Sequence, residues 1–302
     1  MSVIILDGKK IAENFNNQTR SLVGSFVENF SRKPKLSIFL VGDDENSLRY
    51  DTLKVKLANG IGIDASLNQL SDDISERQLI AEIDKTSKKC DGLLVQFPLP
   101  RRMNTNNIVN AINPLKEVDG IHPYHLEKLF DQKNIFTRIS SLDEILPVTP
   151  TGVVILVLEA MRLLGKPSVL NGMSCVVCGR SKLVGIPVSM LLQGLGATVS
   201  VCHSETLEYK RKQLIREADI VVSAVGKAGF IPISECKSGA ICIDVANNYD
   251  DQGKVRGDFT NDVENSEVAA ITPVPGGVGP MTLAMLMRNV INSALIQEKY
   301  KS

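Results

Sequence analysis

Residues 174–185 read SCVVCGRSKLVG, an apolar run followed by a turn that contains two glycines and a serine. The apolar run predicts a buried strand, and the turn after it predicts the N-terminus of a helix. At such a junction, free backbone N–H groups and the positive end of the helix dipole favour a pyrophosphate. Gly179, Ser181 and Gly185 depart from the common G-x-G-x-x-G spacing, because serine replaces the middle glycine and the last glycine comes later. The context still predicts the cofactor-binding turn of a Rossmann-type unit.

The next predicted strand bears on which dinucleotide is bound. It ends at His203-Ser204, roughly 25 residues after Gly179, where folds of this kind contact the adenosine ribose. A carboxylate there binds a ribose 2′-OH and repels a 2′-phosphate, whereas here the strand ends in neutral residues and Arg180 stands in the glycine turn. Arginine and serine suit a dianionic phosphate, although Glu205 lies one residue further on and weakens the inference. The sequence favours NADP over NAD.

Apolar strand-like runs alternate with helical stretches along the chain, a pattern that predicts an α/β fold with mostly parallel sheets. The predicted strands are 37–43, 91–100, 174–178, 197–202, 220–225 and 240–245. The last four, separated by helices, predict a doubly wound unit. LPVTPTG at 146–152 carries two prolines and a glycine and predicts the domain boundary, with a long helix after it and a charged loop over 130–145 before it.

Charge and composition exclude several classes of partner. The 302 residues include 34 basic and 34 acidic side chains, so nothing favours a nucleic acid or an anionic membrane as the main partner. The N-terminal MSVIILDGKK has only a four-residue apolar run before Asp7, too short for a signal peptide or a membrane span. We expect a cytoplasmic protein.

Cys175 and Cys178 form a C-x-x-C, which can mark a redox or metal pair. They lie in the apolar run of a predicted strand, where positions i and i+3 face opposite sides of the sheet. No second C-x-x-C and no His-x-x-x-His accompanies them. We interpret them as small buried hydrophobes and expect no metal site.

Residues 47–56, SLRYDTLKVK, are predicted to form a helix that carries a candidate catalytic lysine. At about 100° per residue, Ser47, Tyr50 and Lys54 share one stripe and Lys56 faces the other way. Taken alone, this pattern is typical of a solvated helix face with an aromatic ring along a lysine stem. The segment ITPVPGGVGPMT (271–282) has two equally supported interpretations. A backbone with so few side chains either admits a flat ligand or forms a rigid linker.

Several motifs taken together are more specific. PVPGGVGPMT, GLLVQFPLP, VDGIHP, PVTPTG, GRSKLVGIP and Tyr50-x-x-x-Lys54 resemble the methylenetetrahydrofolate dehydrogenase/methenyltetrahydrofolate cyclohydrolase family, from IILDGK at the start to the last helix. The resemblance implies an N-terminal folate-binding α/β domain (1–144) completed by a helix at 281–302. It also implies an NADP-binding Rossmann-type domain (145–280), an active-site cleft between the domains, and a homodimer active in one-carbon metabolism and purine biosynthesis.

The resemblance also implies residue roles. Tyr50 would stack on the folate, Lys54 would handle the proton of the cyclohydrolase step, and Gln96 would hold Lys54 in place. Asp119 would accept hydrogen bonds from the pterin ring, and Ser47 would support the lysine. The residues that would line the folate cleft are Pro275, Gly276 and Gly277. Those that would hold NADP are Gly179, Arg180, Ser181, Gly185 and Ser204, of which Arg180 and Ser204 would contact the 2′-phosphate.

The chemistry of lysine fits this role. A free lysine titrates at about pH 10.4 and is a poor base at neutral pH, but burial beside a cationic substrate and an uncharged amide favours its neutral form. Two alternatives remain open. A dehydrogenase that uses NAD and lacks cyclohydrolase activity is disfavoured because family members of that kind lack the lysine. A non-catalytic folate-binding homologue would be expected to have lost Lys54, Gln96 or Asp119.

Three positions depart from the family pattern. His125-Leu-Glu127 stands where Asn-x-Gly is usual, Val148 replaces a common cysteine, and Ala246 replaces a usual glycine. The first change concerns the loop between the domains and the third the turn near the nicotinamide. We interpret His122 and His203, which lie in matched motifs, as structural or positioning residues and not as bases.

Overall fold

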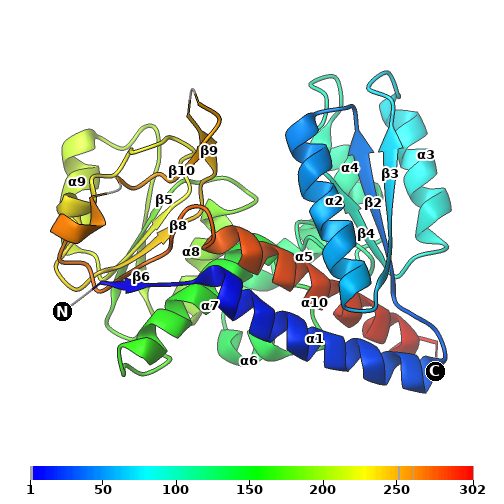
Figure 1. The fold of residues 1–302 in the computed structure, drawn as a ribbon, viewed down its shortest axis with the longest axis horizontal. Coiled ribbons are helices and arrows are strands. Elements are labelled where there is room, and N and C mark those ends of the chain that lie inside the picture. The colour runs from blue at the N-terminus through cyan, green and yellow to red at the C-terminus, as the bar shows by residue number, and fades with distance from the viewer. Residues whose placement is uncertain (1–2, 251, 261, 302) are drawn as a thin grey trace. The chain divides into compact units, whose positions relative to one another are not determined.

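The computed structural model describes residues 3–250, 252–260 and 262–301. The described residues fall into two compact α/β units, each with its own parallel sheet (Figure 1). Unit 1 comprises Met1–Ala12, Leu129–Ile139 and Thr149–Thr282, and unit 2 comprises Glu13–Lys128, Ser140–Val148 and Leu283–Ser302. The expected two-domain α/β architecture is confirmed. The units differ from the expected boundaries in that the first residues of the chain belong to unit 1.

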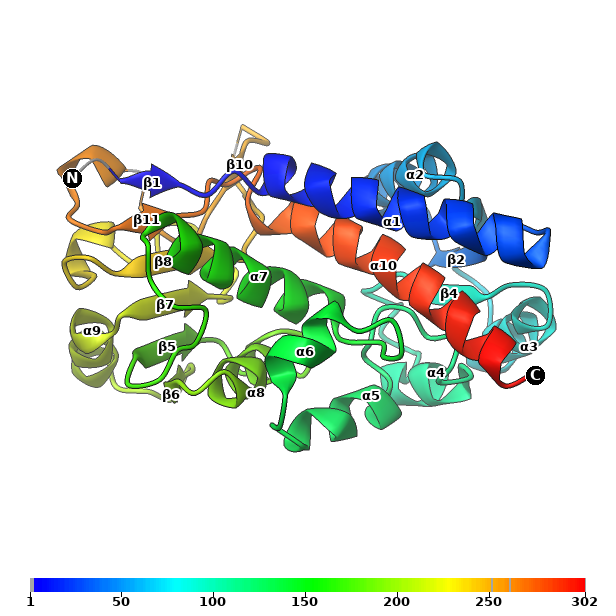
Figure 2. The ribbon, with the colours of Figure 1, turned by 90° about the horizontal axis from the view of Figure 1, so that it is seen from below.

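Unit 1 is built on a six-stranded sheet in the order β1-β11-β8-β7-β5-β6, in which all neighbours are parallel (Figure 2). Its strands are β1 (Ile4–Ile5), β5 (Ser174–Cys178), β6 (Thr198–Cys202), β7 (Ile220–Ser223), β8 (Ile241–Asp244) and β11 (Ala270–Ile271). The chain runs β5 to β6 at one edge and then returns across β5 to β7 and β8. This reversal is the doubly wound order that the sequence predicts.

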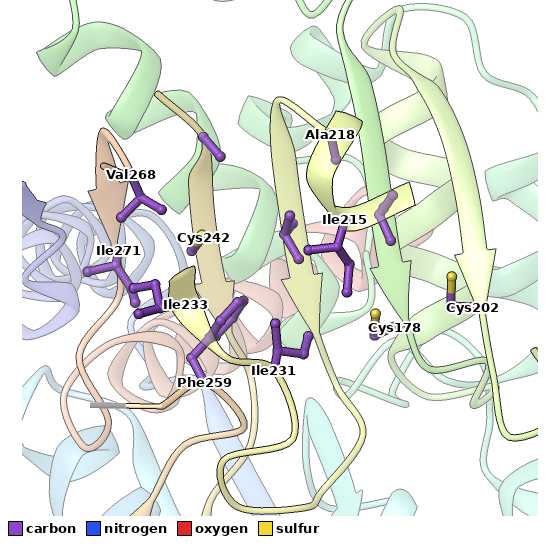
Figure 3. Close-up of a cluster of buried hydrophobic side chains, with 13 residues drawn as sticks. Cys178, Cys202, Ile215, Ala218, Ile231, Ile233, Cys242, Phe259, Val268 and Ile271 are labelled. Carbon is purple, nitrogen blue, oxygen red and sulfur yellow. The ribbon is translucent and has the colours of Figure 1, made fainter. Parts of the chain in front are cut away.

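Helices and short elements cover this sheet. They are α6 (Ile135–Ser140), α7 (Val148–Leu163), α8 (Gly185–Gly194) and α9 (Glu208–Glu217), the 3-10 helices η1 (Lys128–Phe130), η2 (Ile233–Glu235) and η3 (Val263–Asn265), and the antiparallel pair β9 (Asn248–Tyr249) and β10 (Val255–Arg256). Figure 3 shows the apolar cluster on one face, where Phe259 lies beside Ile231 and Ile233. Alternate strand residues such as Val176 and Cys178 point into this cluster, as the two-residue period of a strand requires.

Unit 2 holds a three-stranded parallel sheet in the order β3-β2-β4. The strands are β2 (Lys35–Val41), β3 (Asp64–Leu70) and β4 (Gly92–Val95). The helices are α1 (Gly8–Phe30), α2 (Glu45–Gly60), α3 (Glu76–Ser87), α4 (Thr105–Ala111), α5 (Pro123–Glu127) and α10 (Val278–Lys299), of which α1 and α10 begin in unit 1. Leu36–Val41 and all of β4 are buried, whereas β3 is partly exposed. The continuous apolar runs thus form β2 and β4, the two strands that are buried on both faces.

Several element boundaries differ from the expectation, among them that of the strand expected over 91–100, which as β4 spans only Gly92–Val95. Proline chemistry explains two of the differences. Helices α7 and α10 begin at Val148 and Val278, several residues before the expected starts, with Pro150 and Pro280 in their first turns. Proline is tolerated there because those backbone N–H groups have no partner within the helix. The segment expected to be loop contains α6. Within the described chain, no helix is long and apolar enough to cross a membrane.

Candidate active site

Helix α2 presents its buried face to the strands of unit 2. Asp44 caps its N-terminus by accepting a hydrogen bond from the backbone N–H of Ser47 at 2.8 Å. From this start the helical period buries Lys54 and leaves Lys56 exposed, as the sequence predicts. The Ser47 hydroxyl also hydrogen-bonds Asp44 and lowers the pKa of that carboxyl. Ser47 therefore supports the helix cap, whereas its expected support of the lysine stays a prediction.

The Lys54 ammonium is enclosed by polar and aromatic groups. Nζ donates to Oδ1 of Asp51 at 2.8 Å and to Oε1 of Gln96 at 2.5 Å. It also lies 4.8 Å from the centre of the Tyr50 ring, within the range of a cation–π contact. Gln96 directly follows β4, and its Nε2 donates to the Phe97 carbonyl at 2.6 Å. That bond fixes the amide so that its oxygen points to the lysine.

Asp51 is the residue of this cluster that the sequence reasoning missed. It is fully buried, and its second oxygen, Oδ2, has no hydrogen-bond partner in the described part of the chain. Burial raises the pKa of Asp51, and the nearby charge of Lys54 opposes that rise. The signal was available: residue 51 lies three positions before Lys54, a spacing at which helical side chains meet.

The segment after β4 positions Asp119. Its anchor is the buried carboxylate of Glu117, which accepts the backbone N–H groups of Asp119, Ile121 and His122, each at 2.8 Å. Gly120 has φ +75, and a Cβ there would lie 2.4 Å from the Leu146 carbonyl. The local backbone conformation therefore requires the glycine of the VDG motif, independently of any ligand. Burial raises the pKa of Glu117 to about 8 against those three hydrogen bonds.

The Asp119 side chain remains partly accessible. Burial raises the pKa of this carboxyl, Lys54 lowers it and Asp51 raises it. Asp119 thus interacts electrostatically with the Lys54–Asp51 pair. The structure brings together in unit 2 the four side chains to which catalytic roles were assigned, Tyr50, Lys54, Gln96 and Asp119, and adds Asp51 to them.

The turn after β5 is closely packed in unit 1. Gly179 has φ +126, and a Cβ on it would lie 2.6 Å from the Ala224 carbonyl oxygen. A Cβ on Gly185 would lie 2.1 Å from the Gly179 oxygen, so α8 begins directly against the turn. The Ser181 hydroxyl accepts the N–H groups of Val184 at 3.2 Å and Gly185 at 3.4 Å. Both glycines and the serine hold the helix N-terminus at the turn.

Arg180 and Ser204 leave the sheet at the same edge. Cys178 of β5 is paired in register with Cys202 of β6, and each of the two polar residues follows its cysteine by two positions. Both are exposed. The Ser204 hydroxyl donates to the Glu205 carboxylate at 3.0 Å, so this serine already has an acidic neighbour.

The loop of Pro275, Gly276 and Gly277 belongs to unit 1. Gly276 has φ +113. A Cβ on Gly277 would lie 2.7 Å from the Pro273 carbonyl oxygen, and a Cβ on Gly8 would lie 1.9 Å from the Gly277 oxygen. The close approach of these backbones accounts for the glycines. A role in lining a folate site stays a prediction.

Comparison with known proteins identifies the family. Residues 6–119 match the model of the tetrahydrofolate dehydrogenase/cyclohydrolase catalytic domain, and residues 147–298 match that of its NAD(P)-binding domain. The chain belongs to this tetrahydrofolate dehydrogenase/cyclohydrolase family.

Similar proteins cover almost the whole chain. The bifunctional protein FolD of Staphylococcus saprophyticus is 39% identical over 98% of this chain and 97% of its own. The crystal structure of the bifunctional enzyme FolD from Campylobacter jejuni is 32% identical, with a TM-score of 0.88 over 98% of this chain and 100% of its own. The FolD of Trypanosoma brucei, solved with NADP and an inhibitor, is 29% identical, with a TM-score of 0.88 over the full length of both chains.

The departures from the family pattern have local explanations. His125 is buried in α5, its Nε2 lies 2.7 Å from the Pro114 carbonyl oxygen, and burial lowers its pKa to about 4. Glu127 ends the same helix and is exposed. The Val148 backbone N–H donates to the Asp119 carbonyl at 3.1 Å, a bond that any side chain there permits. Ala246 is not among the described residues with positive φ, so its turn does not need glycine.

The other histidines and the cysteines of the C-x-x-C have local contacts within the fold. His122 caps α5 by accepting the N–H of Tyr124, and His203 accepts the N–H of Glu205. Cys175 and Cys178 are free thiols buried in β5, and Cys178 packs in the apolar cluster of Figure 3. Over the described ranges, no three His, Cys, Asp or Glu side chains are grouped so as to hold a metal ion.

Proposed function

We propose that the Lys54 cluster of unit 2 carries the hydrolytic reaction of this family and that the turn after β5 holds its dinucleotide. The chain is a bifunctional enzyme. It oxidises 5,10-methylenetetrahydrofolate to the 5,10-methenyl cation with NADP, and it hydrolyses that cation to 10-formyltetrahydrofolate. The observation that carries the site assignment is a buried lysine whose ammonium is hydrogen-bonded by Asp51 and Gln96 and lies against the Tyr50 ring.

The hydrolysis needs a group that accepts a proton. Water adds to the carbon between N5 and N10, and the new C–O bond makes the oxygen acidic. Lys54 in its neutral form takes that proton, as a general base within the cluster. Gln96 keeps Nζ in place through its fixed amide oxygen. Tyr50 would offer its ring to the folate for stacking, since aromatic side chains bind flat ring systems by offset or edge contacts.

Asp119 would bind the pterin ring. Its carboxylate is partly accessible, and its backbone is held by Glu117 and by Val148. A preorganised carboxylate can accept two N–H groups from a planar heterocycle and so fix its orientation. Hydride transfer depends chiefly on such positioning, because the dinucleotide carries the redox chemistry.

The residues of unit 1 fit NADP. A Cβ at Gly179 or Gly185 would collide with neighbouring backbone, so these two positions of the turn before α8 carry no side chain. Arg180 lies exposed in the same turn. Gly179, Ser181 and Gly185 would hold the pyrophosphate. Arg180 and Ser204 would contact the 2′-phosphate. When bound, NADP supplies the hydride acceptor.

Three further assignments complete the proposal. We assign folate binding to residues 1–144 with 281–302 and NADP binding to 145–280. The matched ranges 6–119 and 147–298 agree with this division except over 281–298, which the model of the NAD(P)-binding domain includes. Pro275, Gly276 and Gly277 would line the folate site. We also propose a cytoplasmic homodimer that serves purine biosynthesis, on the strength of the family resemblance alone.

A paired assay tests the function. The chain is given 5,10-methylenetetrahydrofolate with NADP⁺ or with NAD⁺, and the absorbance of the reduced cofactor and of the methenyl intermediate is followed. We expect turnover chiefly with NADP⁺ and onward hydrolysis of the methenyl form. Turnover with NAD⁺ and accumulation of the methenyl form would identify a dehydrogenase without hydrolase activity. Folate binding without turnover would identify a non-catalytic homologue.

A further inference from the structure

We infer that Asp51 is a positioning residue for the hydrolysis: it is the counter-ion of Lys54 and sets the pH range in which that lysine can accept a proton. The inference rests on the proposed role of Lys54 and adds to it a partner that the motifs of the family resemblance do not include.

The hydrogen bond to Lys54 accounts for one carboxylate oxygen of Asp51, and the other oxygen lacks a partner in the described part of the chain. The Asp51 side chain is fully buried on α2, and Oδ1 accepts a hydrogen bond from Lys54 Nζ at 2.8 Å. A buried carboxylate without a counter-charge destabilises the folded state, so Asp51 without Lys54 would lower the stability of unit 2. The ion pair with a residue of the active cluster gives this carboxylate a reason to be there.

The other charges around the pair are few. The strands packed against α2 contribute Lys35 and Asp64, both exposed at the strand starts. Asp119 interacts electrostatically with both members of the pair, and Glu117 interacts with Asp119. The remaining neighbours are the neutral amide of Gln96 and the phenol of Tyr50. Asp51 is therefore the carboxylate in direct contact with the lysine.

The pair changes the charge balance of the reaction. When the methenyl cation binds, protonated Lys54 would repel it, so the lysine proton leaves to solvent and Asp51 remains as the negative charge that offsets the substrate cation. Water then attacks the carbon between N5 and N10, one of its protons passes to Lys54, and the resulting ammonium is again neutralised by Asp51. The C–N5 bond then breaks, and the remaining hydroxyl proton moves to N5. One proton is released per cation hydrolysed, and the pair returns to its starting state.

The sign of the pH effect follows from this. A carboxylate 2.8 Å from the ammonium favours the protonated lysine, so it moves the acidic limit of hydrolysis to higher pH. Asp51→Asn keeps the size and an acceptor oxygen but removes the charge. We expect the acidic limb of the kcat/KM profile for methenyltetrahydrofolate hydrolysis to move to lower pH, by between about one and three pH units. Hydride transfer should be retained without the same displacement in its pH profile, because the hydride step passes no proton to the lysine.

The matched control is Asp73→Asn, which removes the same charge from an exposed position of unit 2 and should leave the pH profile in place. An Asp51→Asn profile with an unmoved acidic limb, or a uniform loss of rate at all pH values, would show a merely structural Asp51 and overturn the inference. Complete loss of hydrolysis at every pH, with hydride transfer retained, would also overturn it, because Asp51 would then be the base itself.

A second variant covers the case in which Asp51→Asn does not fold. Asp51→Leu has similar volume and no charge, and we expect the same displacement of the acidic limb. Lys54→Met, assayed in parallel, distinguishes a failure of the proposed role of Lys54 from a failure of the inference about Asp51. If Lys54→Met still hydrolyses the cation, the proposed function of the lysine fails; if it does not, and the Asp51 variants leave the pH profile unmoved, only the inference about Asp51 fails.

Discussion

At the scale of single residues, the cofactor turn and the lysine cluster rest on different kinds of evidence. The cluster is defined by direct contacts of buried side chains, Lys54 to Asp51 and to Gln96. Arg180 and Ser204, which we propose contact the 2′-phosphate, are exposed and are defined by their place at the carboxyl ends of two paired strands. Their roles therefore depend on a ligand contact that substitution can reveal directly.

Arg180→Ala should raise the KM for NADP⁺ far more than the KM for NAD⁺. The substitution removes a charge-assisted contact to the 2′-phosphate, worth roughly 1.5–3 kcal/mol or about a 10- to 100-fold change in KM. Steady-state kinetics with each cofactor provide the measurement. Lys182→Ala, which removes another exposed cation of the same turn, is the control and should change both constants little. Equal effects of Arg180→Ala on the two cofactors would show that Arg180 does not contact the phosphate.

Asp119→Ala should reduce both activities together, by about 10-fold or more for each lost hydrogen bond to the pterin ring. Both reactions need the same ring held in the same orientation, so the effect is not confined to one step. The initial rates of hydride transfer and of methenyl hydrolysis are measured on the same preparation. Hydrolysis at the wild-type rate would contradict the assignment of Asp119 to the pterin.

At the scale of elements, the short helix α5 carries a buried histidine that couples stability to pH. His125 is 2% exposed, and burial lowers its pKa to about 4 from an ordinary value of 6.5. Between these values the unfolded chain binds a proton that the folded chain does not. The free energy of unfolding therefore falls as the pH is lowered from 6.5 towards 4, and is unaffected by this group above 6.5.

His125→Asn tests this coupling. Asparagine can donate to the Pro114 carbonyl as the ring does, but it does not titrate. We expect the stability of wild type relative to the variant to fall by about 3 kcal/mol between pH 6.5 and pH 4. Urea unfolding of the two proteins at several pH values in this window measures the difference. Parallel stability curves for both proteins would contradict the burial of a neutral His125.

The helix phase and the longer strands of unit 1 could be predicted from the sequence because they follow from local periodicity. The stripe that buries Lys54 and exposes Lys56 needs only the helical repeat, and β5, β6, β7 and β8 are marked by apolar runs. The spacing of Asp51 from Lys54 indicates that the two side chains meet, but its burial could not be predicted, because an acidic residue in a polar segment gives no sign of burial until strands β2 and β3 are packed against α2. The start of α7 at Val148 was missed because proline was interpreted as ending structure, although it is compatible with a first turn.

At the scale of the whole molecule, the two units divide the chemistry. Unit 2 contains the lysine cluster and Asp119, and unit 1 contains the glycine turn after β5. Hydrolysis requires a proton acceptor, whereas hydride transfer requires a positioned cofactor and no proton transfer to the protein. Because the demands differ, the account predicts that one activity can be removed while the other is kept.

Lys54→Met is the measurement that tests this most directly. Methionine keeps roughly the volume of the lysine stem but cannot accept a proton. Burial raises the pKa of Asp51 and the charge of Lys54 lowers it, so removing the lysine raises that pKa further. The account predicts that Lys54→Met abolishes methenyltetrahydrofolate hydrolysis and retains measurable hydride transfer, while the exposed Lys56→Met keeps both. A Lys54→Met enzyme that hydrolyses the cation at near wild-type rate would contradict it.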